Sequence, residues 1–373
     1  MKCAAGSIQT FGKGIVMKTN AQAAATSAHT TSDVILSVRN LTKHYPIRRS
    51  LFSRTQSVVH ALEDVSFDVH RGETFAIVGE SGCGKSTTGK CILRLCEPTS
   101  GSVLLQGSDV TTLSGKDLIR ARRAIKLIFQ DPYSSLNPRM SVADIIAEPI
   151  DIARSYHTPQ ERMARVLEVM EQVGLDSSYA SRYPHEFSGG QRQRIGIARA
   201  IILLPKLIVC DEPVSALDVS VQAKIINLLQ ELQKQLGLAY IFISHDLSVV
   251  HHIADTVMVM YLGHVMERAS KATLFEHAYH PYTQSLLGAI PKIGSERIAD
   301  KQILQGDVPS PVSLPSGCVF HTRCPHVQPI CSKKVPELVE IEPGHLCACH
   351  VVQEKFKDRL RDASRKLAHQ AAV

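Results

Sequence analysis

A glycine-rich stretch carries the clearest chemistry in the chain. It comprises Gly79, Glu80, Ser81, Gly82, Cys83, Gly84, Lys85, Ser86 and Thr87, which fit the pattern G-x-x-x-x-G-K-[ST]. Glycines let successive backbone N–H groups converge on phosphate oxygens, Lys85 supplies a cation for the β- and γ-phosphates, and Ser86 offers a hydroxyl to Mg²⁺. Because the apolar run 74–78 reads as a buried strand just before it, the pattern predicts a P-loop that binds a nucleotide.

A second anion site is predicted where the segment 187–194 opens a helix. Ser188 is a natural N-cap, and Gly189 and Gly190 leave backbone N–H groups exposed before Gln191. A positive helix end and free N–H groups suit a phosphate.

Two adjacent carboxylates, Asp211 and Glu212, end an apolar strand. Two adjacent carboxylates would repel each other in an apolar core. One that binds Mg²⁺ and one that activates a water molecule would account for the pair better than a structural salt bridge does. Gln130 also follows an apolar strand, at the end where α/β sheets bind ligands. His245 ends a further strand and in isolation would be an ordinary capping residue.

Taken in order, these motifs resemble the nucleotide-binding subunit of an ABC transporter. The Ser-Gly-Gly-Gln loop at 188–191 separates that family from other P-loop NTPases, and the segment 215–218 follows the acidic pair as the family requires. The resemblance implies an α/β P-loop NTPase fold with a RecA-like core, a small antiparallel β-subdomain and a helical subdomain carrying the signature loop. It also implies that two subunits close head to tail over ATP.

The same resemblance implies roles for single residues. Mg²⁺ would be held by Ser86, by Gln130 and, through water, by Asp211. Glu212 would be the general base and His245 would contact the γ-phosphate. Tyr45 would stack on adenine, and Asp218 would link the two sites.

A narrower resemblance points to the ATPases of dipeptide and oligopeptide importers. It rests on the segment 131–139 after Gln130, the basic loop 46–55 after Tyr45, the His-Pro-Tyr-Thr motif at 280–283 and the cysteine-rich region that follows. It implies a second ATPase subunit that forms a heterodimer with this chain, two transmembrane permease subunits and an extracytoplasmic peptide-binding protein. Nickel importers and some related exporters share parts of the pattern, so an ATPase for nickel or another small solute is an alternative.

A soluble ABC ATPase acting on nucleic acid or ribosomes is a further alternative. Those proteins usually carry a long coiled-coil insertion or duplicated ATPase halves, and neither is visible in these 373 residues. The net charge of +7 comes from scattered Lys and Arg, which indicates a solvated surface, so no nucleic-acid partner is expected. A pure metal-binding regulator would leave the ATPase motifs unexplained. Because no run of 18 apolar residues occurs, the expected location is the cytoplasmic face of the inner membrane, held peripherally by partners.

The chain divides into four expected parts. They are a flexible tail at 1–32, a nucleotide-binding domain at 33–290 with its helical subdomain at about 137–187, a cysteine-rich extension at 291–350 and a basic C-terminal helix at 351–373. Within the helical subdomain, the periodicity of apolar residues predicts amphipathic helices at 142–153 and 160–173.

The cysteines form two populations. Cys83 lies in the P-loop near a helix start and Lys85, which favour a reactive thiolate; the alternative is an inert small residue. Five others crowd into the last quarter, at 318, 324, 331, 347 and 349, without the short C-x₂₋₄-C pairs typical of structural zinc. Histidines nearby in the sequence could complete a zinc site, which is one alternative. Thiols that bind no metal are another.

The extension also resembles one that holds a [4Fe–4S] cluster in dipeptide importer ATPases. That match implies the ligands Cys318, Cys324, Cys331 and Cys349 and leaves Cys347 as an extra thiol.

Overall fold

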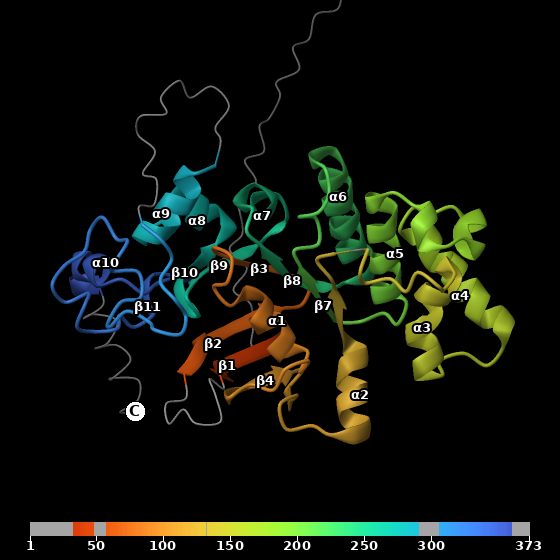
Figure 1. Cartoon of the computed structure of the whole chain (residues 1–373), viewed down its shortest axis with the longest axis horizontal. Coiled ribbons are helices and arrows are strands. Elements are labelled where there is room, and N and C mark those ends of the chain that lie inside the picture. Colours follow the sequence, from red (N-terminus) through yellow and green to blue (C-terminus); the bar gives the residue numbers. More distant parts are fainter. Residues whose placement is uncertain (1–32, 48–56, 132, 291–305, 360–373) are drawn as a thin grey trace, which may run out of the picture.

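The computed structural model describes residues 33–47, 57–131, 133–290 and 306–359. The expected N-terminal tail, most of the basic loop after Tyr45 and the end of the expected C-terminal helix lie outside these residues. Figure 1 shows an elongated molecule, with helices α3 and α4 at one end and the C-terminal elements α10 and β11 at the other. No helix in the described part of the chain is long and apolar enough to cross a bilayer.

The described residues build a central sheet of eight strands in the order β11-β12-β10-β9-β3-β8-β7-β6. The strands are β3 (Thr74–Val78), β6 (Ile125–Ile128), β7 (Leu207–Asp211), β8 (Ala239–Ser244), β9 (Thr256–Tyr261), β10 (His264–Ser270), β11 (Val339–Glu342) and β12 (His345–Cys347). From β6 to β9 the neighbours run parallel, whereas β10, β12 and β11 are antiparallel additions. The parallel strands are apolar at nearly every position because both faces are covered.

Alternating side chains of the P-loop strand show the two covered faces. Ala76 and Val78 belong to a core shared with α3 (Val142–Ala153), α4 (Pro159–Gln172), α5 (Gly189–Ile201), α6 (Val219–Leu236) and α7 (Leu247–Ile253). Phe75 and Ile77 belong to a second core shared with α1 (Lys85–Ile92) and a smaller sheet. The P-loop therefore starts from a strand fixed on both sides.

The smaller sheet is antiparallel and has the order β2-β1-β4-β5. Its strands are β1 (Val34–Ile47), β2 (Ser57–His70), β4 (Ser100–Leu105) and β5 (Ser108–Asp109). Tyr45 lies on β1 opposite Val59 of β2, so the expected small antiparallel β-subdomain carrying Tyr45 is confirmed. The remaining helical elements are α2 (Gly115–Ala124), η2 (Ser177–Ser181), η3 (Pro184–Glu186), α8 (Lys271–Glu276), α9 (Pro281–Gly288) and α10 (His350–Lys355).

Local sequence explains where the helices of the expected helical subdomain begin. The Ser141 hydroxyl caps α3 by accepting the Asp144 N–H. Thr158 and Glu161 form a reciprocal capping box at the start of α4, with Pro159 in the first turn. The predicted helix 142–153 is α3, and the predicted helix 160–173 is α4 shifted by one residue.

The C-terminal region joins the central sheet, which sequence analysis did not predict. Arg268 and Glu267 of β10 pair with Leu346 and Cys347 of β12, and β12 pairs with β11. The signal was present, because residues 339–342 alternate apolar and charged side chains before a Pro343-Gly344 turn. The last quarter of the chain is thus continuous with the ATPase core.

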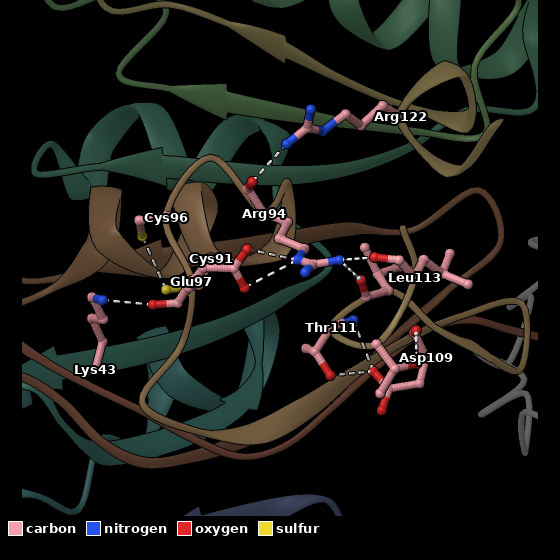
Figure 2. Close-up of polar contacts among 11 residues, drawn as sticks. Lys43, Cys91, Arg94, Cys96, Glu97, Asp109, Thr111, Leu113 and Arg122 are labelled. Atoms are coloured by element: carbon pink, nitrogen blue, oxygen red, sulfur yellow. Dashed lines mark hydrogen bonds and ion pairs between the residues drawn. The ribbon is translucent and has the colours of Figure 1, made fainter. Parts of the chain in front are cut away.

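Arg94 fastens the C-terminal end of the P-loop helix to the neighbouring turn (Figure 2). Its Nε lies 3.0 Å from both carboxylate oxygens of Glu97, and its Nη1 donates to the carbonyls of Val110 and Leu113. Replacing Arg94 with alanine leaves two partly buried carbonyls without this donor, so we expect a loss of about 2 kcal/mol in the free energy of unfolding.

The matched control is Arg122→Ala, which removes an exposed guanidinium that donates to the Arg94 carbonyl at 2.8 Å. A surface change of this kind is expected to stay within about 0.5 kcal/mol. Urea unfolding of both variants measures the difference. Equal stabilities for the two variants would show that the Arg94 contacts contribute nothing.

Candidate functional site

A cleft of about 780 Å³ gathers most of the predicted site residues. A volume of this size suits a small-molecule ligand. From the predicted set, its lining contains Tyr45, Gly79, Glu80, Ser81, Gly82, Gly84, Lys85, Ser86, Thr87, Gln130, Glu212 and His245. These residues come from both sheets and from the ends of β3, β6, β7 and β8, so the cleft lies at the carboxyl ends of parallel strands, as predicted.

Two glycines of the P-loop are required by close backbone approach. A Cβ on Gly79 would lie 2.2 Å from the Met260 carbonyl oxygen, and a Cβ on Gly84 would lie 2.4 Å from that of Ala61. Both also have positive φ angles, 150° and 105°. Lys85 is buried, and its Nζ donates to the carbonyls of Gly79 at 2.7 Å and Glu80 at 2.9 Å. The loop therefore holds its own cation in place.

Asp211 lies next to the P-loop serine at the end of β7. The Ser86 hydroxyl donates to Asp211 Oδ1 at 2.7 Å. Burial raises the pKa of Asp211, and the neighbouring charge of Glu212 raises it further, whereas the Ser86 hydrogen bond lowers it. A hydroxyl and a half-buried carboxylate side by side are a donor set that suits Mg²⁺, whose charge would offset this cost.

Glu212 has a backbone conformation unusual for a residue with a side chain, with φ at 48°. The Gln130 amide donates to Glu212 Oε2 at 2.9 Å, and His245 Nδ1 lies 3.1 Å from Oε1. Left-handed backbone is uncommon and costly in a residue other than glycine. Here it accompanies a carboxylate held between Gln130 and His245 inside the cleft.

The signature loop lies outside this cleft. Ser188 and Gln191 form a capping box at the start of α5, in which Ser188 accepts the Gln191 N–H and Gln191 Oε1 accepts the Ser188 N–H at 3.0 Å. Ser188 and Gly189 are exposed, Gly190 is half-buried, and Asp218 caps α6 at the surface. The structure thus brings together the P-loop, Gln130, Asp211, Glu212 and His245, but not the signature loop or Asp218.

The expectation of a reactive Cys83 is wrong for the structure. Its side chain is 3% exposed. Burial raises the pKa of the Cys83 thiol, and the smaller opposing effect of Lys85 does not reverse the shift. Desolvation of a thiolate outweighs the nearby cation here, so Cys83 is a small packed residue under Gly79.

Two residues from beyond the predicted site contact the P-loop through Glu80. The Arg323 guanidinium meets the Glu80 carboxylate with contacts of 2.7 and 3.1 Å, and the Glu80 N–H donates to the Tyr282 hydroxyl at 2.9 Å. Tyr282 belongs to the His-Pro-Tyr-Thr motif, whereas no sequence pattern singled out Arg323. Sequence reasoning missed this connection between the C-terminal region and the nucleotide cleft.

Comparisons with known proteins agree with this geometry. Residues 62–215 match the ABC transporter family, and residues 266–331 match the oligopeptide/dipeptide transporter C-terminal region. The oligopeptide transport ATP-binding protein AppF of Bacillus subtilis is 52% identical over 86% of this chain and 98% of its own length. The chain belongs to the ATP-binding proteins of oligopeptide ABC transporters. A putative peptide import ATP-binding protein of Brucella ovis is 51% identical, over 86% of this chain and 98% of its own.

Solved structures give the same fold. The ATP-binding cassette MJ0796, a dimer bound to ADP and phosphate in a post-hydrolysis state, matches with a TM-score of 0.57 and 29% identity over 63% of this chain and 98% of its own. The cbiO1 protein of Clostridium perfringens, part of an ABC transporter complex, matches with a TM-score of 0.57 and 29% identity over 66% and 92%. The chain is accordingly an ABC ATPase that binds ATP.

Proposed function

We propose that this protein hydrolyses ATP to power the import of dipeptides and oligopeptides through a membrane permease. The observation that carries the proposal is the cleft in which the P-loop, Gln130, Glu212 and His245 meet. The peptide substrate is supported by the C-terminal region at 266–331 and by the relatives, whose names specify oligopeptide or peptide transport.

In the proposed mechanism, the chain contributes positioning and charge. Lys85 and the P-loop N–H groups bind the phosphates, and Tyr45, 37% exposed at the rim of the cleft, stacks on adenine. Glu212 accepts a proton from the attacking water, while His245 contacts the γ-phosphate. Gln130, hydrogen-bonded to Glu212, couples loss of the γ-phosphate to a shift of the helical subdomain.

Mg²⁺ would be held by Ser86, Gln130 and, through water, Asp211, where it would neutralise phosphate charge. The hydrogen bond between Ser86 and Asp211 supports this assignment, because both ligand groups already face the same point beside the P-loop.

We further propose that two ATPase subunits close head to tail. The exposed signature loop and Asp218, both outside the cleft of their own chain, support a site completed by the signature loop of a second subunit. The dimeric state named for the solved cassette MJ0796 is consistent with it. A heterodimer with a related ATPase, two transmembrane permease subunits and an extracytoplasmic peptide-binding protein would complete the transporter, with this chain at the cytoplasmic face of the membrane.

Reconstitution tests the function. The chain is purified with its partner ATPase and both permease subunits, placed in liposomes that enclose ATP, and supplied with the peptide-binding protein and a labelled oligopeptide outside. We expect the uptake of labelled peptide to require ATP. An excess of unlabelled peptide should suppress this uptake. ATP-dependent uptake of Ni²⁺ with no peptide uptake would replace the proposed substrate, and failure of the chain to associate with the permease would refute the transport role.

For the cysteine-rich region we propose a [4Fe–4S] cluster on Cys318, Cys324, Cys331 and Cys349. The Cys318 N–H donates to the Cys331 carbonyl at 2.7 Å, and a Cβ on Gly317 would lie 2.4 Å from that carbonyl oxygen. Burial, together with the neighbouring thiols of Cys349, Cys331 and Cys324, raises the pKa of Cys318 to about 11. The closeness of these four thiols supports one shared cluster, for which we propose a structural role.

The thiols are not grouped as closely as a single bound zinc ion would need. A single tetrahedral Zn²⁺ requires sulfur atoms about 3.8 Å apart. Within the described residues no three of these thiols lie within 4.8 Å of one another, whereas the larger cluster accepts one thiolate at each iron. The thiol of Cys349 raises the pKa of both Cys318 and Cys324, whereas Cys347 lies on β12 opposite Glu267, which supports Cys349 as the fourth ligand.

We expect protein purified without oxygen to contain about four iron and four sulfide per chain. Cys349→Ser should lower both contents sharply, and the matched Cys347→Ser should retain them. Stoichiometric zinc without sulfide would eliminate the cluster. Equal loss of iron and sulfide in both variants would contradict the assignment of Cys349 as the fourth ligand.

A further inference from the structure

Three metal-binding side chains converge on the small sheet, and none of them belongs to the two ligand sets proposed above. His44 Nε2 lies 2.6 Å and His60 Nδ1 lies 2.5 Å from the same oxygen of Glu63. The two imidazole rings are 4.6 Å apart between centroids and inclined at 62°. Of the described residues, only these three bring metal-donor atoms from three side chains within 4.8 Å of one another.

A β-bulge explains how the three side chains reach one point. His44 of β1 pairs directly with His60 of β2, and Lys43 pairs with Leu62, so Ala61 is an extra residue on β2. In a regular strand, residues three apart point to opposite faces. The extra residue shifts the alternation, which puts His60 and Glu63 on the same face.

Each of the three backbones is fixed by a different neighbouring segment. The His44 N–H donates to the Thr99 hydroxyl at 2.9 Å, the His60 N–H to the Pro311 carbonyl at 2.9 Å and the Glu63 N–H to the Gly263 carbonyl at 3.0 Å. The arrangement is therefore held in place before any ligand arrives, which lowers the entropic cost of binding.

We propose that His44, His60 and Glu63 form a binding site for a first-row divalent transition metal, with Zn²⁺ the best-matched ion. Two imidazole nitrogens and one carboxylate oxygen are a zinc ligand set, and three protein ligands leave a fourth position for water. Imidazole also selects against Mg²⁺ and Ca²⁺, which prefer oxygen.

Binding requires only a small adjustment. A tetrahedral zinc with ordinary bond lengths needs its ligand atoms about 3.3 Å apart, wider than the present contacts to Glu63. The side chains of His44, His60 and Glu63 are 30%, 33% and 24% exposed, so they have room to separate and an ion can enter from solvent.

The position of the site gives the metal a structural consequence. Tyr45, proposed to stack on adenine, directly follows His44 and lines the nucleotide cleft with Ala61 and Pro311. A metal that joins His44 to His60 would clip β1 to β2 next to Tyr45 and restrict the movement of this rim. This consequence depends on the proposed nucleotide role of Tyr45, but the metal site itself does not.

Zinc binding to the intact chain tests the proposal, with Zn²⁺ alone as the probe in equilibrium dialysis. Compared with the wild-type chain, His44→Gln, His60→Asn and Glu63→Gln are each expected to lose one bound Zn²⁺ or to bind it at least about 100-fold more weakly. The thiols of the C-terminal region are unchanged in every variant. The difference in bound zinc between wild type and variant therefore reports on this site alone.

His70→Asn is the matched control. His70 ends β2 and contacts Glu73, in the turn that follows, at 3.0 Å with the same three-residue spacing, but this pair forms no such triad within the described residues. This variant is expected to keep the wild-type zinc content.

A second measurement guards against misfolded variants. In wild-type protein, Zn²⁺ should raise Tm more than in His60→Asn, while circular dichroism and ATP binding of the variant without added zinc match the wild type. Equal zinc content and affinity in wild type and all three ligand variants would overturn the proposal. A loss shared by His70→Asn would overturn it as well.

Discussion

Replacing Glu212 with glutamine is expected to lower the ATPase rate of the assembled transporter by at least about 100-fold while ATP stays bound. The amide keeps the size of the side chain and can still accept a hydrogen bond from Gln130, but it cannot accept a proton from water. Substrate binding by the P-loop is untouched, so the loss falls on the chemical step and appears in kcat rather than in ATP affinity.

The measurement uses the transporter with the corresponding change in both ATPase subunits, so that neither site can hydrolyse ATP. Steady-state phosphate release gives the rate, and retained radiolabelled ATP reports the closed state. Glu231→Gln is the control, because it makes the same chemical change at an exposed position on α6, outside the cleft. A wild-type rate in the Glu212 variant would show that another group is the base.

The parts of the site that sequence predicted are those in which one short segment sets the backbone. The P-loop pattern itself places Lys85 and Ser86, because the glycines permit the required turn and the helix start follows directly. Asp211 and Glu212 were predicted at the carboxyl end of a strand, and the structure puts them there. Periodicity also located α3 and α4 to within about a residue, since their apolar faces are unambiguous.

Long-range and burial-dependent features escaped sequence analysis. The contact between Arg323 and Glu80 joins residues 243 positions apart, and no local pattern signals it. Reactivity of Cys83 was judged from its neighbours in sequence, whereas its pKa depends first on burial by the folded chain. The bulge at Ala61 also escaped sequence analysis. One extra residue on β2 changes which face of the sheet the following side chains occupy.

The connection through Arg323 predicts that the C-terminal region controls nucleotide binding. The Arg323 side chain is 6% exposed and that of Glu80 26%, so the bidentate pair is shielded from solvent. Glu80 also accepts a hydrogen bond from Lys85 through its carbonyl and donates its N–H to Tyr282. Without Arg323, the Glu80 carboxylate would stand unpaired beside the phosphate site and repel the nucleotide.

Arg323→Met is therefore expected to weaken ATP binding about tenfold and to lower the free energy of unfolding by about 3 kcal/mol, because it strands a partly buried charge. A double variant with Glu80→Gln removes both charges and should recover much of each loss, which a merely additive effect would not do. Arg359→Met is the control from the same region: its ion pair with Glu342 is exposed, and its removal should change stability by less than about 1 kcal/mol. ATP titration and urea unfolding of the wild type, Arg323→Met, Glu80→Gln, the double variant and Arg359→Met measure the coupling. Additive losses in the double variant would refute an electrostatic link between the C-terminal region and the P-loop.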